Sequence, residues 1–281
     1  MKIKLAKHSG FCFGVKRAVN LALSTVQKNG GKNIYTLGPL IHNPQVIQEL
    51  ERKGIRNAAP GARIGSGIVL VCSHGMHPDI LARLRRKKIK VVDATCPFVK
   101  KIEYIVLRLK KEKIPIIIVG DKDHPEVKAI TGYAGRRALV IDQEEDARRL
   151  PPLPKIGVVA QTTQSEEKFA AVCRALKKKA GEVRIFNTIC DATKKRQQEA
   201  LKLARQVEKI VIVGGYNSAN TKRLVNLCRE LGKPTLHIEE ASELTRRFFR
   251  GVRKVGVMAG ASTPDWIIAE VIGKIKTMEE E

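Results

Sequence analysis

Short apolar runs alternate with longer amphipathic stretches along the whole chain. The apolar runs have the length of strands, and the longer stretches repeat their apolar residues with the period of a helix. This alternation is typical of parallel sheets covered by helices, so it predicts the α/β class. The expected strands are Lys2–Leu5, Ile34–Leu37, Ile68–Cys72, Lys90–Val92, Ile114–Val119, Ala138–Ile141, Ile156–Ala160, Val183–Phe186, Ile210–Val213, Thr235–Ile238 and Val255–Met258. The expected helices include Val15–Gln27, Pro97–Lys111, Glu166–Lys179, Asp191–Val207 and Asn220–Leu231.

Three cysteines, Cys12, Cys96 and Cys190, share one local pattern: an apolar strand, the cysteine, and then a helix. A cysteine at a helix N-terminus lies where the dipole and the free N–H groups favour a thiolate. Each cysteine is also followed, at the fourth and fifth positions, by a basic pair. These pairs are Lys16 and Arg17, Lys100 and Lys101, and Lys194 and Lys195. The matching flanks indicate an internal repeat, whereas the simpler alternative is three unrelated buried cysteines.

The repeat predicts three similar α/β units with parallel-rich sheets, arranged around a pseudo-threefold axis. The first unit spans residues 13–96 and the second spans 97–189. The third spans 190–281 and takes in the N-terminal strand, 1–12, which feeds Cys12 and closes the ring. Ligands of α/β sheets collect beyond the carboxyl ends of the strands, where the three cysteines fall. We therefore expect a central cavity that receives one cysteine from each unit.

Composition narrows the class of protein. Hydrophobic residues make up 43% of the chain, enough for a core, and the net charge of +25 attracts anionic partners. Aromatic residues are scarce at 4%, which argues against a platform that stacks nucleic-acid bases. The chain shows no secretory signal and no apolar run of membrane-spanning length. We expect a cytoplasmic protein, whose six cysteines serve metal or redox chemistry rather than disulfides.

Three convergent thiolates would leave one iron of a cubane iron–sulfur cluster without a protein ligand. Such an open iron can bind substrate as a Lewis acid. A zinc ion with three cysteines and an open position is the competing interpretation. The remaining cysteines, Cys72, Cys173 and Cys228, lack the shared flanks; Cys173 and Cys228 fall inside amphipathic helices, where we expect them to pack in the core.

Histidines follow three further strands, each close to a proline that starts a helix. They are His42, His74 and His124, and Glu126 stands two residues after the last of them. A single histidine is more often structural than functional. Three in equivalent loops favour function, because helix starts are natural anion sites to which histidine adds charge-assisted hydrogen bonds.

Hydroxyl-rich loops follow three other strands. Gln161–Ser165 contains Thr162, although N-capping by Thr163 or Ser165 accounts for part of this segment. GGYNSANTKR and AGASTPDW can present backbone N–H groups and side-chain donors to phosphate oxygens through Ser218, Asn220 and Ser262. Neither segment is a Walker A motif.

These motifs together resemble one family. CFGV, IHNPQV, the His74-Gly75 pair, DATCP, GDKDHPEV, QTT, the Cys190 segment, NSAN and ASTPDW occur in the order typical of the 4-hydroxy-3-methylbut-2-enyl diphosphate reductases, the LytB family. The resemblance covers essentially the whole chain. One departure is Ala219, which stands where many members carry another serine, so one hydrogen bond to phosphate would be missing or supplied by a backbone N–H.

The resemblance implies a specific assignment. Cys12, Cys96 and Cys190 would hold one [4Fe–4S] cluster whose open iron binds the substrate's allylic hydroxyl. Glu126 and Thr162, with His124, would serve proton delivery. The reaction would remove the hydroxyl as water with two electrons and two protons, giving isopentenyl and dimethylallyl diphosphates. The residues expected around the diphosphate are His42, His74, His124, Ser218, Asn220 and Ser262.

Two other functions stay open at this point. A nucleic-acid-binding protein would explain the charge, but the chain lacks helix-turn-helix, zinc-finger and RNA-binding signatures. A zinc hydrolase could use the three flanked cysteines with Glu126. For the reductase, the basic charge suggests an acidic electron donor, a ferredoxin or a flavodoxin. Self-repulsion at this charge favours a monomer, and we expect no nucleic-acid or membrane partner.

Overall fold

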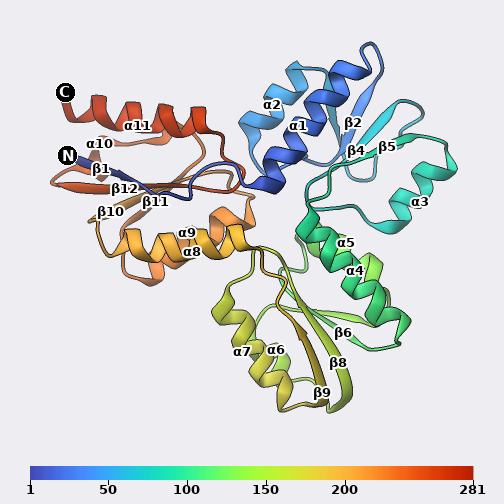
Figure 1. The fold of residues 1–281 in the computed structure, drawn as a ribbon. Coiled ribbons are helices and arrows are strands. Elements are labelled where there is room, and N and C mark those ends of the chain that lie inside the picture. The colour runs from blue at the N-terminus through green and yellow to red at the C-terminus, as the bar shows by residue number, and fades with distance from the viewer. Residues whose placement is uncertain (281) are drawn as a thin grey trace. The chain divides into compact units, whose positions relative to one another are not determined.

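The protein is built from three four-stranded sheets in which every pair of neighbouring strands is parallel (Figure 1). The structure is a computed structural model, and it describes residues 1–280. The predicted α/β class with three similar parallel sheets is confirmed. The division at residues 13, 97 and 190, and a common axis, stay predictions.

The first sheet has the strand order β3-β2-β4-β5. On one of its faces Leu37, Val69 and Val71 pack with Leu81 and Leu84 of helix α3. The sequence pattern missed β3, because it is an edge strand in which only Ile55 is fully buried and so it has no apolar run. The elements are β2 (Ile34–Leu37), β3 (Ile55–Ala58), β4 (Ile68–Val71), α3 (Pro78–Arg86) and β5 (Lys90–Asp93).

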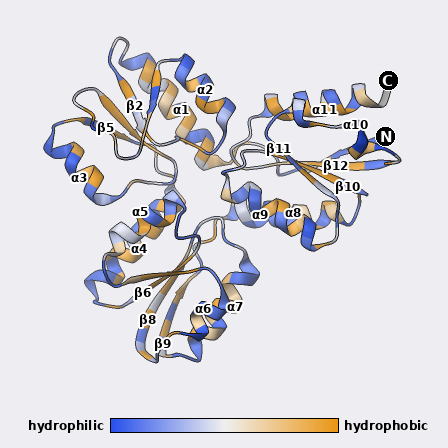
Figure 2. Cartoon of the chain, turned by 180° about the vertical axis from the view of Figure 1, so that it is seen from behind, coloured by the Kyte–Doolittle hydropathy of each residue, from blue (hydrophilic) through white to orange (hydrophobic). Residues whose placement is uncertain are grey.

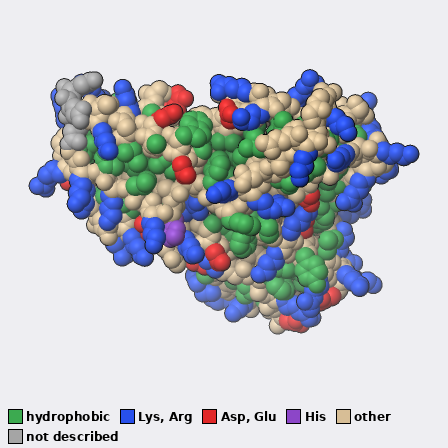
Figure 3. Space-filling view, turned by 45° about the horizontal axis from the view of Figure 1, so that its top comes forward, with side chains coloured by type: hydrophobic (Ala, Val, Ile, Leu, Met, Phe, Trp, Pro, Cys, Tyr) green, Lys and Arg blue, Asp and Glu red, His purple; other side chains and the backbone are tan. Residues whose placement is uncertain are grey.

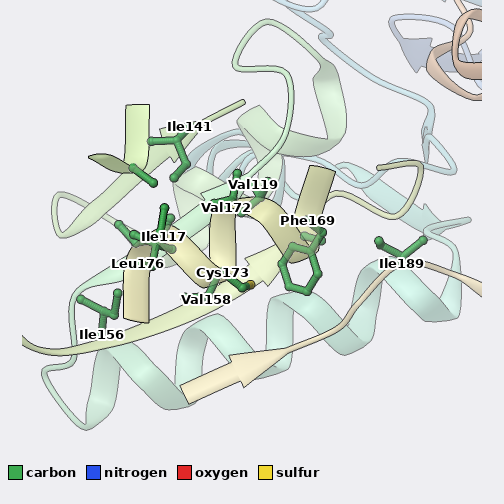
Figure 4. Packing of buried hydrophobic residues seen from close by; sticks show 13 residues of the cluster. Ile117, Val119, Ile141, Ile156, Val158, Phe169, Val172, Cys173, Leu176 and Ile189 are labelled. Carbon is green, nitrogen blue, oxygen red and sulfur yellow. The ribbon is translucent and has the colours of Figure 1, made fainter. Parts of the chain in front are cut away.

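The second sheet, ordered β7-β6-β8-β9, shows how alternation along one strand covers two faces. Ile116 and Ile118 of β6 pack against α4 and α5, whereas Ile117 and Val119 pack on the side of α6 and α7 (Figure 4). Successive strand residues point to opposite faces, so a strand buried on both sides is apolar throughout. The elements are α4 (Pro97–Lys111), β6 (Ile116–Val119), α5 (Pro125–Ala134), β7 (Ala138–Ile141), α6 (Glu144–Arg148), β8 (Leu153–Ala160), α7 (Glu166–Lys177) and β9 (Ala180–Phe186).

The third sheet joins the N-terminal strand to the last strands of the chain, in the order β1-β12-β10-β11. Ile210 and Ile212 pack against α8 and α9, and Val211 and Val213 against α11. The elements are β1 (Lys2–Leu5), α8 (Asp191–Ala204), β10 (Lys209–Val213), α9 (Ala219–Glu230), β11 (Thr235–Ile238), the 3₁₀ helix η1 (Ala241–Glu243), α10 (Arg246–Phe249), β12 (Lys254–Ala259) and α11 (Asp265–Glu280).

The chain divides into two compact units. The smaller contains Met1–Lys16, Ile41–Gln48 and the described chain from Asp191 onward, and so carries the third sheet. The larger contains Arg17–Leu40 and Glu49–Cys190, with the first and second sheets. The boundary between the units falls inside two helices, α1 (Phe13–Lys28) and α2 (Pro44–Arg52).

Most helices are amphipathic, with an apolar face on a sheet and a polar face outward (Figure 2). Four of them, α2, α3, α4 and α5, begin at a proline, and the residue before it caps the helix. Proline fits there because its absent N–H would have no partner in the first turn. Among the described residues, no helix is both long and apolar enough to span a bilayer.

Candidate functional site

The three flanked cysteines each stand at the junction of a strand and a helix. Cys96 is the N-cap of α4, with Pro97 in the first turn, as predicted. Cys12 immediately precedes α1, and its Sγ accepts a hydrogen bond from the Val15 backbone N–H at 3.5 Å. Cys190 immediately precedes α8. A sulfur at a helix start faces N–H donors that favour its anionic form.

The three sheets present site residues after equivalent strands. In each sheet one edge strand leads to a flanked cysteine: β5 to Cys96, β9 to Cys190 and β1 to Cys12. The strand beside it (β4, β8 or β12) leads respectively to His74, Thr162 or Ser262. One strand further in, β2 leads to His42, and β6 leads to His124 and Glu126. In the third sheet β10 leads to Ser218 and Asn220. All the predicted site residues therefore follow carboxyl ends of parallel strands, where α/β sheets bind ligands.

One backbone hydrogen bond recurs at all three cysteines. The N–H of Cys96 donates to the carbonyl of Ser73 at 2.8 Å, and Ser73 precedes His74. Likewise the Cys190 N–H donates to the Thr162 carbonyl at 3.1 Å. In the smaller unit the Cys12 N–H donates to the carbonyl of Ala261, just before Ser262, at 3.0 Å. Each cysteine is thus held against the neighbouring loop that carries a predicted site residue.

The other cysteines lie in different surroundings. Cys12, Cys96 and Cys190 are partly exposed, whereas Cys72, Cys173 and Cys228 are buried. Burial raises the pKa of Cys72 to about 12, and that of Cys173 to about 11. It raises the pKa of Cys228 to about 11 as well. Cys173 lies on α7 and packs among apolar side chains (Figure 4). Cys228 lies on α9 and packs in the core of the third sheet. The predicted packing role of these two cysteines is confirmed.

A buried carboxyl group lies beside Thr162. Glu126 is 4% exposed, and its Oε1 accepts from the Thr162 backbone N–H at 2.6 Å. Its Oε2 accepts from the Thr162 hydroxyl at 2.7 Å. Burial raises the pKa of Glu126 above its usual range, and the bonds from Thr162 oppose part of that rise. A buried carboxyl group with a raised pKa is suited to holding a proton near neutral pH.

Two histidines accompany this carboxyl group in the larger unit. His124 caps α5, its Nδ1 accepting from the Glu126 backbone N–H at 3.1 Å, which leaves Nε2 as the donor in the neutral ring. The His74 ring lies edge-on to it, with the centroids 6.4 Å apart. Gly75 permits the turn after His74, because its φ of +86° is strained for other residues.

The smaller unit brings together His42, Ser218, Asn220 and Ser262. The Ser262 hydroxyl donates to the His42 carbonyl at 2.9 Å, and Ser218 caps α9 by accepting from the Thr221 N–H. Burial lowers the pKa of His42, and the positive charge of Lys222 lowers it further. The Nδ2 group of Asn220 is buried and, among the described residues, has no hydrogen-bond partner. Such a donor is normally satisfied, so it is suited to a ligand oxygen.

The sequence pattern missed the residues that support this pocket. Asn43 is fully buried and caps α2, its Oδ1 accepting from the Val46 N–H at 2.9 Å. Thr221 packs so close to Gly260 that a Cβ at the glycine would lie 2.2 Å from its hydroxyl. The IHNP and NSANT segments contain both residues, but only tertiary packing identifies their roles.

The basic pairs of the repeat also have structural partners. Arg17 donates to the Thr95 carbonyl, adjacent to Cys96, at 3.1 Å. Lys100 bridges two carboxylates, Asp93 at 2.9 Å and the buried Glu103 at 2.8 Å. Asp93 in turn accepts from the backbone and hydroxyl of Thr95. These contacts brace the turn that carries Cys96.

The structure does not by itself assemble the complete metal site. Cys96 and Cys190 belong to the larger unit, and Cys12 to the smaller. Among residues 1–280, no three His, Cys, Asp or Glu side chains lie close enough together to hold a metal ion. The convergence of all three cysteines stays a prediction.

Comparison with known proteins finds relatives that match along almost the whole chain. A family model described as "LytB protein" matches residues 3–276. Curated proteins named 4-hydroxy-3-methylbut-2-enyl diphosphate reductase, from Geotalea uraniireducens and Geobacter sulfurreducens, are each 50% identical over 281 residues. In both cases the alignment covers 100% of this chain and 99% of the relative.

Solved structures match as well. One of (E)-4-hydroxy-3-methyl-but-2-enyl diphosphate reductase, described as the terminal enzyme of the non-mevalonate pathway, is 43% identical with a TM-score of 0.70. The match covers 99% of this chain and 100% of that one. The reductase from Plasmodium falciparum is 28% identical with a TM-score of 0.91, over 97% of this chain and 87% of that one.

The brace at Cys96 predicts a difference between two adjacent lysines. Lys100→Met should destabilise the protein by about 2 kcal/mol, because it leaves the buried Glu103 carboxylate without its positively charged partner. Lys101→Met is the matched control, since Lys101 is exposed on the same helix. The double change Lys100→Met with Glu103→Leu should recover most of the loss in thermal unfolding. Equal effects of the two lysine changes would contradict this interpretation.

The contrast among the cysteines predicts an order of chemical modification. In reduced, metal-free protein at about pH 8, iodoacetamide should label Cys12, Cys96 and Cys190 well before Cys72, Cys173 and Cys228. The latter group is buried and holds its protons, and only the thiolate reacts. Peptide mass spectrometry over a time course measures the order. Early labelling of Cys72 would contradict it.

Proposed function

The chain belongs to the LytB family, and on this premise we propose that it is a 4-hydroxy-3-methylbut-2-enyl diphosphate reductase. It removes the allylic hydroxyl of its substrate as water, with two electrons and two protons, and yields isopentenyl and dimethylallyl diphosphates. This is the last step of the non-mevalonate isoprenoid pathway. The observation that carries the proposal is the recurring bond that holds each flanked cysteine against a loop with a histidine or hydroxyl group.

Cys12, Cys96 and Cys190 would hold one [4Fe–4S] cluster. Their surroundings suit thiolate ligands, because each is partly exposed and placed at a helix start. Bound there, the cluster would supply electrons and a Lewis-acidic iron with no protein ligand. The other three thiols, buried and with raised pKa, do not suit this role.

Glu126 and Thr162 would supply protons, since hydroxide is a poor leaving group and needs a positioned acid. Glu126 Oε1 accepts from a backbone N–H, so the acidic proton belongs on Oε2. With that proton Oε2 would donate to the Thr162 hydroxyl oxygen, the reverse of the bond that the carboxylate accepts. That hydroxyl can pass the proton on and take another from Glu126. His124 shares the loop of Glu126, and with its Nδ1 held by the Glu126 backbone N–H it would offer Nε2–H as the donor.

The diphosphate would bind among His42, His74, His124, Ser218, Asn220 and Ser262. The unpartnered Asn220 Nδ2 and the start of α9 support an anion there. Ala219 occupies the first position of α9, where the backbone N–H has no intrahelical partner. That N–H can replace the hydroxyl of the serine found in many family members.

The remaining parts of the proposal concern partners and organisation. The charge of +25 suits an acidic electron donor, a ferredoxin or a flavodoxin. Free cysteines and an iron–sulfur cluster suit the cytoplasm. We also propose that the protein is a monomer. Its three α/β units would span residues 13–96, 97–189, and 190–281 with 1–12, around a central cavity.

Anaerobic metal analysis tests the cofactor. The purified protein should contain about four irons and four sulfides per chain, as a cubane cluster requires. Replacing any one of Cys12, Cys96 or Cys190 by serine should lower the iron content severely. Cys173→Ser is the matched control and should retain it. Zinc in place of iron, with activity in air, would favour the hydrolase interpretation instead.

Substitution of the buried acid tests the proton route. Glu126→Gln should retain the cluster and substrate binding but lower kcat at least about 100-fold, the usual contribution of a general acid. Because the pKa of Glu126 is raised, ionisation destabilises the folded state as pH rises, so this variant should be at least as heat-stable as the wild type at pH 8. Glu145→Gln, at an exposed position, is the control. A near-normal kcat would remove Glu126 from the mechanism.

A further inference from the structure

A large groove in the larger compact unit has His74 in its lining, but among the described residues none of the others assigned above to the cluster, the proton route or the diphosphate. Its volume is about 1010 Å³, and its walls come from the first and second sheets with α3 and α5. Met76, Ile80 and Val140 are among its apolar lining residues. Ligand pockets typically measure about 300–1,000 Å³. A five-carbon chain would fill little of this space, so the groove suits a longer apolar group.

The rim of the groove is basic. Lys122, Lys128 and Arg136 line it with exposed side chains, and Asp79 supplies a negative charge. Lys128 also lies 3.8 Å from the exposed carboxylate of Asp123. Lysines and arginines cover much of the visible surface (Figure 3), so charge alone does not mark a site. Cations beside an apolar wall do indicate a binding site. They can bind the anionic head group of a ligand while the wall contacts its apolar chain.

A polar anchor lies in the wall itself. The Oγ1 atom of Thr131 is buried and, within the described chain, has no hydrogen-bond partner. Thr131 lies on α5 and lines the groove between the basic rim and the apolar wall. Buried hydroxyl groups are normally satisfied, so this position favours a ligand atom or an ordered water.

The groove also touches the backs of two site loops. One wall includes His74, Gly75 and Met76, the turn that follows β4. The other includes Pro125 and Lys128 at the start of α5, which surround Glu126 in the chain. An occupant would therefore contact both loops, and with them His74.

We propose that this groove binds an organic phosphate or diphosphate whose apolar chain is longer than five carbons, and that its binding lowers turnover through the two loops. The rim holds the phosphate head, and the apolar wall holds the chain. The effect on turnover rests on the proposed function, whereas binding of the phosphate compound does not, because calorimetry measures it apart from turnover.

Titration calorimetry on the anaerobic, cluster-containing protein tests the site. Farnesyl diphosphate should bind at least about tenfold more tightly than isopentenyl diphosphate, since each added buried CH₂ group contributes. Farnesol and dodecanoate should bind at least about tenfold more weakly than farnesyl diphosphate, because they lack the phosphate head. Dodecanoate binding as tightly as farnesyl diphosphate would overturn the assignment of a phosphate ligand.

A charge-reversal pair locates the site. Lys122→Glu with Arg136→Glu should weaken farnesyl diphosphate binding at least about tenfold. Lys32→Glu with Lys111→Glu makes the same change in net charge at exposed positions outside the groove, and should alter it by less than about threefold. In turnover assays farnesyl diphosphate should lower kcat without raising KM. Equal effects of the two pairs, or purely competitive inhibition, would overturn the proposal.

Discussion

The backbone hydrogen bond from each flanked cysteine to the loop beside it organises the chemistry of this chain. Each bond joins the loop after an edge strand to the loop after its neighbour, in three sheets with the same order. Because the bond uses backbone atoms, side chains can vary while the thiol stays beside His74, Thr162 or Ser262. The parallel ladders set the strand ends level, and at Cys12 the helix start also directs the Val15 N–H at the sulfur.

Two opposing effects act on the pKa of Glu126. Desolvation disfavours the carboxylate and raises its pKa, while two hydrogen bonds from Thr162 favour it. Desolvation prevails, so the group holds its proton closer to neutral pH than an exposed glutamate does. An acid of this kind must be enclosed by apolar packing, and Val127 and Ile130 of the same helix are buried in the second sheet's core. The helix that carries Glu126 therefore also contributes to the core of that sheet.

Much of this was readable from the sequence, because strands buried on both faces are apolar throughout and the cysteine flanks repeat. The hydrophobic pattern missed strand residues that are held by hydrogen bonding to a neighbouring strand rather than by burial of their side chains. The edge strand β3 has a single buried residue, and β8 begins at Leu153, three residues before the predicted start. Pro154 is tolerated there because β8 pairs at that end only with β9. Contacts between distant residues, such as Arg17 with Thr95, leave no periodic signal.

The basic charge of the chain is divided between distinct roles. Arg17 and Lys100, which follow two of the cysteines, are engaged by a carbonyl and by carboxylates, so they stabilise a turn rather than attract a ligand. Lys122 and Arg136 stand exposed beside an apolar groove and are available to an anion. Net charge alone would assign all of these cations to the same partner. The contacts of these cations distinguish their roles. A cation paired with a buried carboxylate is needed for the structure, whereas an exposed cation at the groove rim can bind an anion.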